Sequence, residues 1–150
     1  MEFSRQVGAL PVRRGPDGAL NVLLVTTLQT QRWIIPKGWP LPGRQDWAAA
    51  VAEACEEAGV LGEAQEGSIG SYTYEKRRSS GSVPVRVSVF LLEVREELET
   101  WPECTRRRRA WFTLGDAAEA VREPELRALL LQIKAASERP SPGAEAASEA

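Results

Sequence analysis

Histidine is absent from the 150 residues of this sequence. Its absence excludes catalysis by a serine–histidine or cysteine–histidine pair, and it removes the commonest protein ligand of transition metals. Acid–base or metal chemistry in this chain therefore has to depend mainly on carboxylates.

Cysteine is nearly as scarce, since the chain has only Cys55 and Cys104. Two isolated cysteines neither form a disulfide framework nor have the spacing of a zinc site, so we expect reduced thiols, with Cys55 buried. Long apolar runs are also missing, and the segment from Met1 to Leu10 lacks the basic start and apolar stretch of a secretory signal. We therefore expect a cytoplasmic protein that does not bind membranes.

Neither sign of charge dominates, because 19 Lys and Arg stand against 21 Asp and Glu. This balance does not favour binding to a nucleic-acid polymer. The length and a hydrophobic content of 43% are typical of one globular domain, which we place at residues 1–137. Residues 138–150 contain no large apolar side chain, and we expect them to form a disordered C-terminal tail.

Segments rich in β-branched and aromatic residues alternate with turn signals along the chain. They predict strands at 3–13, 20–28, 33–37, 68–78, 83–94 and 109–114. A helix is expected at 47–58, with Asp46 as its N-cap and Gly59 as a left-handed terminator. Two further helices are expected at 116–121 and 125–137. This order of elements predicts a mixed β-sheet flanked by helices, of the α+β or α/β class.

Three glutamates lie in the alanine-rich helix expected at 47–58. At about 100° per residue, Glu53, Glu56 and Glu57 project from one sector of that helix, and small Ala49 and Ala50 flank it. An acidic pattern of this kind is more often a solvated helix face. Hard cations such as Mg²⁺, however, prefer oxygen ligands and are commonly held by carboxylates together with substrate phosphates.

The residues around these acids resemble the Nudix box of the Nudix hydrolases, G-x5-E-x7-R-E-U-x-E-E-x-G-U, where U is a bulky aliphatic residue. The matching positions, at the spacing of the family, are Gly38, Glu53, Glu56, Glu57, Gly59 and Val60. The resemblance implies a Nudix α/β/α sandwich and a metal-dependent pyrophosphohydrolase. Its substrate would be a nucleoside diphosphate derivative, a dinucleoside polyphosphate or a diphosphoinositol polyphosphate, cleaved at a phosphoanhydride bond by water.

The same resemblance implies the roles of the box residues. Glu53, Glu56 and Glu57 would be catalytic and would bind Mg²⁺ or Mn²⁺, with a backbone oxygen from the Gly38 region. One glutamate would help to deprotonate the attacking water. The family also recruits bases from outside the box, and the alternatives in this chain are Glu96, Glu97, Glu99 and Glu103.

Two positions depart from the family pattern. Arg44 stands in place of the first glutamate of the box, and Ala52 in place of an arginine that would orient Glu56 from one helical turn away. These departures leave open an alternative, a catalytically weakened Nudix module that binds a phosphorylated ligand or partner. A structural domain whose acidic helix only aids solubility is a third reading.

Basic side chains supply candidates for binding the substrate, because arginine and lysine pair with phosphate oxygens. The candidates are Lys37, Arg44, Arg77 and Arg78. The run at 106–109 is the most basic stretch, but we favour its neutralisation by nearby acids. The Gly-Trp-Pro sequence after Lys37, and Trp111-Phe112 followed by an acidic, alanine-rich helix, resemble the branch of diphosphoinositol polyphosphate phosphohydrolases. We expect a small phosphorylated substrate, and the sequence leaves monomer and homodimer equally open.

Overall fold

A single mixed sheet of eight strands forms the centre of the computed structural model, which describes residues 3–138. The strands are β1 (Ser4–Arg14), β2 (Leu20–Thr26), β3 (Trp33–Ile34), β4 (Lys37–Gly38), β5 (Val60–Ala64), β6 (Gly70–Arg78), β7 (Gly81–Glu97) and β8 (Arg109–Thr113). Their order is β3-β2-β1-β7-β5, with β4 beside β1, β6 beside β7 and β8 beside β2. Among the strand pairs of residues 3–138, only the central β1–β7 pair is parallel, so the predicted mixed sheet is confirmed.

The long strand β7 shows why the sheet needs a layer of helices on each side. Val85, Val87 and Val89 are fully buried on one of its faces, as the alternation in the sequence predicts. Phe90 and Leu92 are buried on the other face. A strand that is apolar on both faces needs other elements packed against each face of the sheet.

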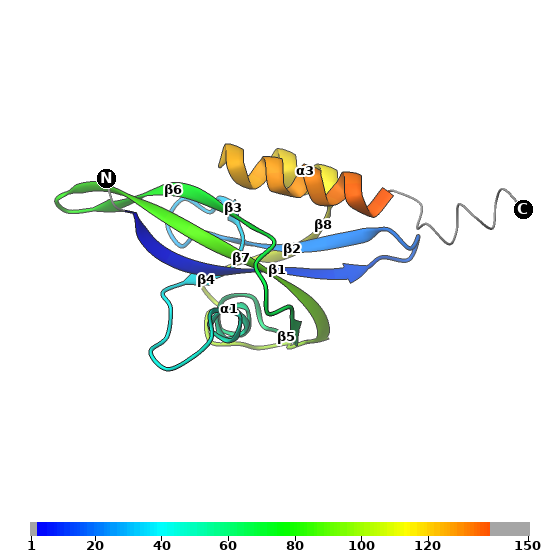
Figure 1. The fold of residues 1–150 in the computed structure, drawn as a ribbon. Helices are drawn as coiled ribbons and strands as arrows, with labels where there is room; N and C mark the ends of the chain where they lie inside the picture. Colours follow the sequence, from blue (N-terminus) through cyan, green and yellow to red (C-terminus); the bar gives the residue numbers. More distant parts are fainter. Residues whose placement is uncertain (1–2, 139–150) are drawn as a thin grey trace, which may run out of the picture.

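Helices cover both faces of the sheet (Figure 1). On one side lies α1 (Asp46–Glu53), which continues into a π-helical turn, η1 (Ala54–Ala58). On the other side lie α2 (Leu114–Ala120) and α3 (Pro124–Glu138). Helix α3 buries Leu126 and Leu130 against the sheet. The α/β/α sandwich implied by the resemblance is therefore confirmed.

The helix that carries the acids differs in detail from its prediction. Its N-cap is Gln45, not Asp46, and Asp46 lies in the first turn, where it forms an ion pair of 2.6 Å with Arg5. Gly59 ends η1 in the left-handed conformation, with φ 66°, as predicted. Cys55 was expected to be buried but is partly exposed.

The face of this helix that packs on the sheet is also turned relative to the simple helical wheel. Ala49 and Ala50, expected beside the acidic sector, are fully buried, and Ala54 and Ala58 continue their row. Small side chains let a helix approach a sheet closely, and the π turn changes the angle between successive residues. Glu57 lies next to Ala58 of this row and is therefore also buried, with only 7% of the residue exposed.

One strand, β5, was not predicted, because its five residues include Gly62 and a charged residue and show little β character. A side chain at Gly62 would overlap the Glu93 carbonyl across the β5–β7 pair, where the register shifts. The tail predicted at 138–150 lies outside the described residues, apart from Glu138 at the end of α3. Between residues 3 and 138, none of the helices combines the length and the apolar character that crossing a membrane requires.

Candidate active site

The glycine that opens the box lies directly under a box carboxylate. A Cβ atom added at Gly38 would overlap the carboxylate of Glu53. The backbone of β4 and the end of α1 are therefore as close as a residue without a side chain permits. This contact places the Glu53 carboxylate on the segment that includes Lys37 and Gly38.

Glu57 is the most buried of the three box acids. One of its carboxylate oxygens accepts a hydrogen bond of 3.2 Å from the backbone N–H of Lys37. The other lies 3.3 Å from a guanidinium nitrogen of Arg107. Glu56, by contrast, is exposed. The three acids therefore have different surroundings, although a wheel drawn from the sequence places them in one sector.

Arg107 connects this acid to two other parts of the chain. Its guanidinium donates a hydrogen bond of 2.8 Å to the carbonyl of Thr26, at the end of β2, and forms an ion pair with Glu103. Only 9% of its side chain is exposed. No local pattern distinguishes Arg107 from the rest of the basic run at 106–109, because its partners Thr26 and Glu57 are distant in the chain. It supplies a cation beside the box acids, where Ala52 cannot.

Arg109, at the end of the basic run, is also engaged in the fold. Arg109 donates hydrogen bonds to the carbonyls of Ala58, Gly59 and Leu98, which caps the end of η1. Its guanidinium also lies 4.0 Å from the centre of the Trp101 ring. Within the run, acids and a carbonyl thus compensate Arg107, and backbone carbonyls compensate Arg109.

Burial and mutual repulsion change the acidity of the box glutamates. Burial, followed by the charges of Glu57, Glu56 and Glu103, raises the pKa of Glu53 to about 7. Burial also raises the pKa of Glu57 to about 7, against the opposing charges of Arg107 and Lys37. At neutral pH these acids hold protons that ordinary glutamates release, and a bound cation would oppose that effect.

Lys37 joins the acids to a cavity. Its ammonium donates a hydrogen bond of 3.3 Å to the hydroxyl of Tyr74, which in turn donates one of 2.8 Å to Gln6. Burial lowers the pKa of Lys37 to about 8, although the charge of Glu57 partly opposes the shift. The hydrogen bond to Tyr74 therefore positions the lysine at the wall of the cavity.

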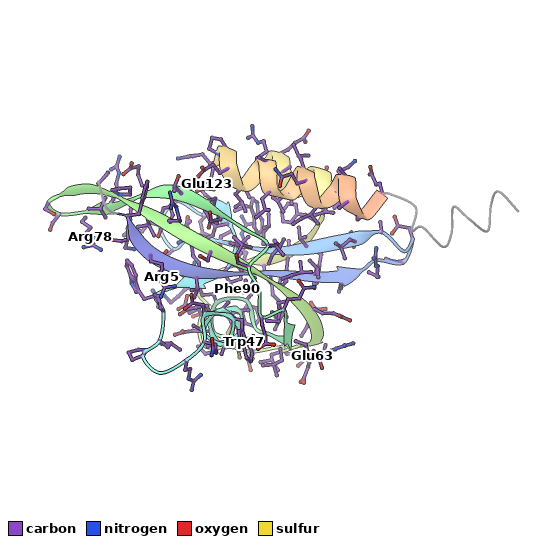
Figure 2. The ribbon with its side chains drawn as sticks, viewed as in Figure 1. Arg5, Trp47, Glu63, Arg78, Phe90 and Glu123 are labelled. Carbon is purple, nitrogen blue, oxygen red and sulfur yellow. The ribbon has the colours of Figure 1, made fainter. Side chains whose placement is uncertain are left out.

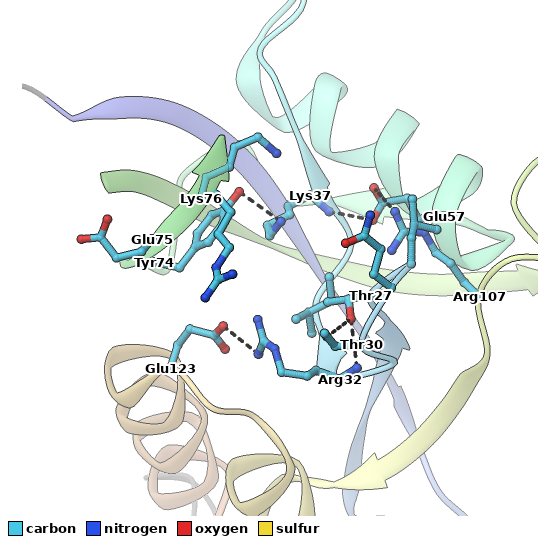
Figure 3. Close-up of a pocket in the computed structure, with 14 residues that line it drawn as sticks. Thr27, Thr30, Arg32, Lys37, Glu57, Tyr74, Glu75, Lys76, Arg107 and Glu123 are labelled. Atoms are coloured by element: carbon cyan, nitrogen blue, oxygen red, sulfur yellow. Dashed lines mark hydrogen bonds and ion pairs between the residues drawn. The ribbon is translucent and has the colours of Figure 1, made fainter. Parts of the chain in front are cut away.

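The cavity has a volume of about 360 Å³ and is drawn in Figure 3. Its basic lining residues are Arg32, Lys37, Lys76, Arg77 and Arg107. Its acidic lining residues are Glu57, Glu75 and Glu123. The excess of basic side chains favours an anionic ligand, and the volume is within the range typical of small-molecule sites.

The structure brings some of the predicted substrate residues together and separates others. Lys37 and Arg77 line the cavity with Glu57. Arg44 lies in a separate surface hollow with Asp46. Arg78 lies at the outer end of the β6–β7 hairpin (Figure 2) and is not among the lining residues. Of the predicted substrate residues, Lys37 and Arg77 are thus the ones that face the cavity.

The alternative bases also differ in position. Glu103 contacts Arg107 and contributes to the pKa shifts of the box acids. Glu97 instead pairs with Arg13 at 2.9 Å and accepts a hydrogen bond from Trp111, away from the cavity. Glu96 and Glu99 are exposed. Among the four alternatives, only Glu103 thus belongs to the network around Glu57.

A second pair of cavity residues was missed by sequence reasoning. Glu123, just before α3, forms an ion pair of 3.2 Å with Arg32, which lies 91 residues earlier in the chain. No local pattern distinguishes Glu123 from an ordinary acid at the start of a helix. Only the folded chain reveals this pair.

The acids fit a hydrated divalent cation better than a closed metal cage. Within residues 3–138, no three histidine, cysteine or acidic side chains converge closely enough to hold a metal ion by themselves. Magnesium usually keeps several waters and takes one or two carboxylates together with substrate phosphates. Glu53 and Glu57, with a basic cavity beside them, match that mode of binding.

Known proteins similar to this chain share both its sequence pattern and its fold. The NUDIX domain model matches residues 3–133. The chain is 37% identical over 101 residues to Nudix hydrolase 4 of Arabidopsis thaliana, covering 67% of this chain and 47% of that protein. It is 35% identical over 104 residues to diphosphoinositol polyphosphate phosphohydrolase 3-beta of Bos taurus, covering 67% and 60%. The chain thus spans about half of the length of these curated relatives.

Solved structures agree on the fold. The crystal structure of a C. elegans Ap4A hydrolase superposes with a TM-score of 0.63 at 22% identity, covering 89% of this chain and 98% of that chain. The box lies on the β4–α1–η1 segment, and the domain model extends over nearly all of the described residues. The chain therefore belongs to the Nudix family.

Proposed function

We propose that this protein is a metal-dependent hydrolase of phosphoanhydride bonds. Its substrates are nucleoside diphosphate derivatives, dinucleoside polyphosphates or diphosphoinositol polyphosphates. The observation that carries the proposal is the position of Glu53 and Glu57, whose carboxylates lie against Lys37 and Gly38 at the edge of a basic cavity. Similarity to proteins named Ap4A hydrolase and diphosphoinositol polyphosphate phosphohydrolase supports the substrate class.

Glu53, Glu56 and Glu57 would hold Mg²⁺ or Mn²⁺, with a backbone oxygen from the Gly38 region, and we propose Glu53 and Glu57 as the principal ligands. When bound, such ions would neutralise phosphate charge and lower the pKa of the attacking water. The water oxygen forms a bond to phosphorus, the bridging P–O bond breaks, and the leaving phosphate keeps the electron pair. A box glutamate takes the proton of the water.

The phosphates of the substrate would be bound by basic residues of the cavity. Lys37 and Arg77 line it directly and are proposed as phosphate contacts. Arg44 and Arg78, predicted for the same role, would reach the substrate only if it extends beyond the cavity. Lys37 is the better placed, because Tyr74 and the neighbouring Glu57 fix its position.

The alternative of a catalytically weakened binding module rests on Arg44 and Ala52. Arg107 weakens that alternative in part, because it places a guanidinium beside Glu57, although the arginine missing at position 52 would orient Glu56. A module without catalysis would still bind a phosphorylated ligand in the basic cavity. Turnover, and not binding, therefore distinguishes the two functions.

The decisive experiment is a screen for hydrolysis products in the presence of Mg²⁺ or Mn²⁺. The panel contains ADP-ribose, diadenosine tetraphosphate and a diphosphoinositol polyphosphate. Wild type is compared with Glu57→Gln and with Glu63→Gln, a matched control at an exposed position of β5. We expect turnover that Glu57→Gln abolishes and Glu63→Gln retains. Absence of any turnover, or full activity in Glu57→Gln, contradicts the proposal.

A further inference from the structure

Glu123 has one buried carboxylate oxygen without a hydrogen-bond donor in the described part of the chain. The residue is only 8% exposed and lines the cavity together with Lys37 and Glu57. One carboxylate oxygen accepts a hydrogen bond of 3.2 Å from Arg32, whereas Oε1 has no partner among the residues that the structure describes. Leaving a buried charged acceptor unsatisfied is costly, so such an atom in a cavity wall points to a ligand that donates to it.

The position of Glu123 separates it from the box acids. Figure 3 shows Glu123 and Arg32 beside the start of α3, and Glu57 and Arg107 on the opposite side of the cavity. The cavity therefore has one end that combines the box acid Glu57 with Lys37. Its other end offers a carboxylate oxygen held in place by Arg32.

The negative charge of Glu123 determines which ligand groups can bind at this second end of the cavity. A carboxylate is only an acceptor, so it binds hydroxyl or amino hydrogens and repels phosphate oxygens. Arg32 already compensates part of the charge, so an uncharged donor suffices to satisfy the remaining oxygen. The volume of about 360 Å³ leaves room for more than a diphosphate.

We infer that Glu123 is a specificity residue, which accepts a hydrogen bond from a hydroxyl or amino group on the organic part of the substrate. The cavity therefore selects a phosphoanhydride attached to a nucleoside or sugar that retains such donors. A polyol with phosphate on every hydroxyl is disfavoured, because it would bring an anion against Glu123. This inference rests on the proposed function, since it assumes that the phosphates occupy the end with the box acids.

Equilibrium binding tests the inference without turnover. Calorimetry in Mg²⁺ compares three probes: adenosine 5′-(α,β-methylene)diphosphate, methylenediphosphonate, which lacks a nucleoside, and inositol hexakisphosphate, which lacks a free hydroxyl. The proteins are wild type, Glu123→Gln and Glu119→Gln, a control at an exposed position of α2. In Glu123→Gln the amide oxygen replaces the acceptor for Arg32, which turns the amide N–H toward the donor of the ligand.

Wild type and Glu119→Gln should bind the adenosine compound at least about tenfold more tightly than methylenediphosphonate, as a buried hydrogen bond to a charged group predicts. Glu123→Gln should lose this preference, keep its affinity for methylenediphosphonate and gain affinity for inositol hexakisphosphate. The inference is overturned if Glu123→Gln keeps the preference, or if wild type favours inositol hexakisphosphate. If Glu123→Gln fails to fold, the preference of wild type among the three probes still decides the question.

The result is distinguishable from a failure of the proposed function. Nucleoside-selective binding that depends on Glu123, without turnover of any substrate, would overturn the hydrolase proposal and keep this inference. Turnover of a diphosphoinositol polyphosphate with kinetics unchanged in Glu123→Gln would support the hydrolase proposal and overturn this inference.

Discussion

Ionisation of the two buried box acids, Glu53 and Glu57, should make the metal-free protein less stable as the pH rises. The pKa of Glu57 is about 7 in the folded chain against an ordinary value of 4.5, so the native state binds more protons than the unfolded state between these values. The contribution of protonated Glu57 to the free energy of unfolding is therefore complete below pH 4.5, and it is lost as the pH rises through 7. At about 1.4 kcal/mol per pKa unit, the loss is about 3 kcal/mol.

Glu53 has the same sign, with a pKa raised to about 7, but it is only partly buried. After allowance for solvent screening its contribution is about 1 kcal/mol. Lys37 interferes little, because its pKa, lowered from 10.5 to about 8, changes stability mainly between pH 8 and pH 10.5. The predicted total of about 4 kcal/mol is large beside the 5–15 kcal/mol, roughly, that stabilises a typical domain.

Urea unfolding with a chelator at pH 5 and pH 8 measures most of this difference, since pH 5 lies just above the ordinary pKa of 4.5. Millimolar Mg²⁺ should restore stability at pH 8, since a cation favours the ionised acids, and should do little at pH 5. Glu57→Gln resembles the protonated acid, so without metal at pH 8 it should be more stable than wild type, by about 2–3 kcal/mol. Stability that stays constant or rises between pH 5 and pH 8, or a Glu57→Gln variant less stable than wild type at pH 8, would refute the reasoning.

Three further predictions follow from single contacts. Arg107→Ala should weaken Mn²⁺ binding about tenfold or more in calorimetry, because it removes the guanidinium that orients Glu57, and Arg107→Lys should recover part of the affinity. Equal affinity in wild type and both variants would contradict this role. Gly38→Ala should displace the Glu53 carboxylate and lower kcat about a hundredfold with little change in melting temperature; unchanged kcat would show that this close approach is not required. Leu130→Ala should lower the free energy of unfolding by about 2–5 kcal/mol in urea titrations and leave kcat unchanged; a loss below 1 kcal/mol would argue against the buried α3 face.

Local sequence signals were enough to predict most of the fold. The alternation of apolar residues along β7 and the left-handed Gly59 after η1 both follow from one stretch of chain. The strand β5 was missed, because its pairing with β7, and not its own residues, makes it a strand. Periodicity thus identifies an element when the element carries its own apolar face.

The candidate site was predictable only where the box fixes it. Glu53 and Glu57 were found from their spacing, but their orientation was not, because the helical wheel assumed a regular α-helix through η1. Arg107 lies 50 residues from Glu57, and Glu123 lies 91 residues from Arg32. Contacts at such separations depend on how the sheet brings loops together, and no local pattern encodes them.

The replacement of the box arginine by Ala52 changes what holds the acids in place. An arginine at position 52 would come from the same helix as the acids, whereas Arg107 comes from the loop between β7 and β8. This loop is docked on η1, because Trp101 donates a hydrogen bond of 3.0 Å to the carbonyl of Glu57, and Arg109 donates to the carbonyls at the end of the turn. The geometry of the acids is therefore coupled to the docking of a distant loop, so substitutions that loosen the loop should reduce metal affinity even though they remove no ligand.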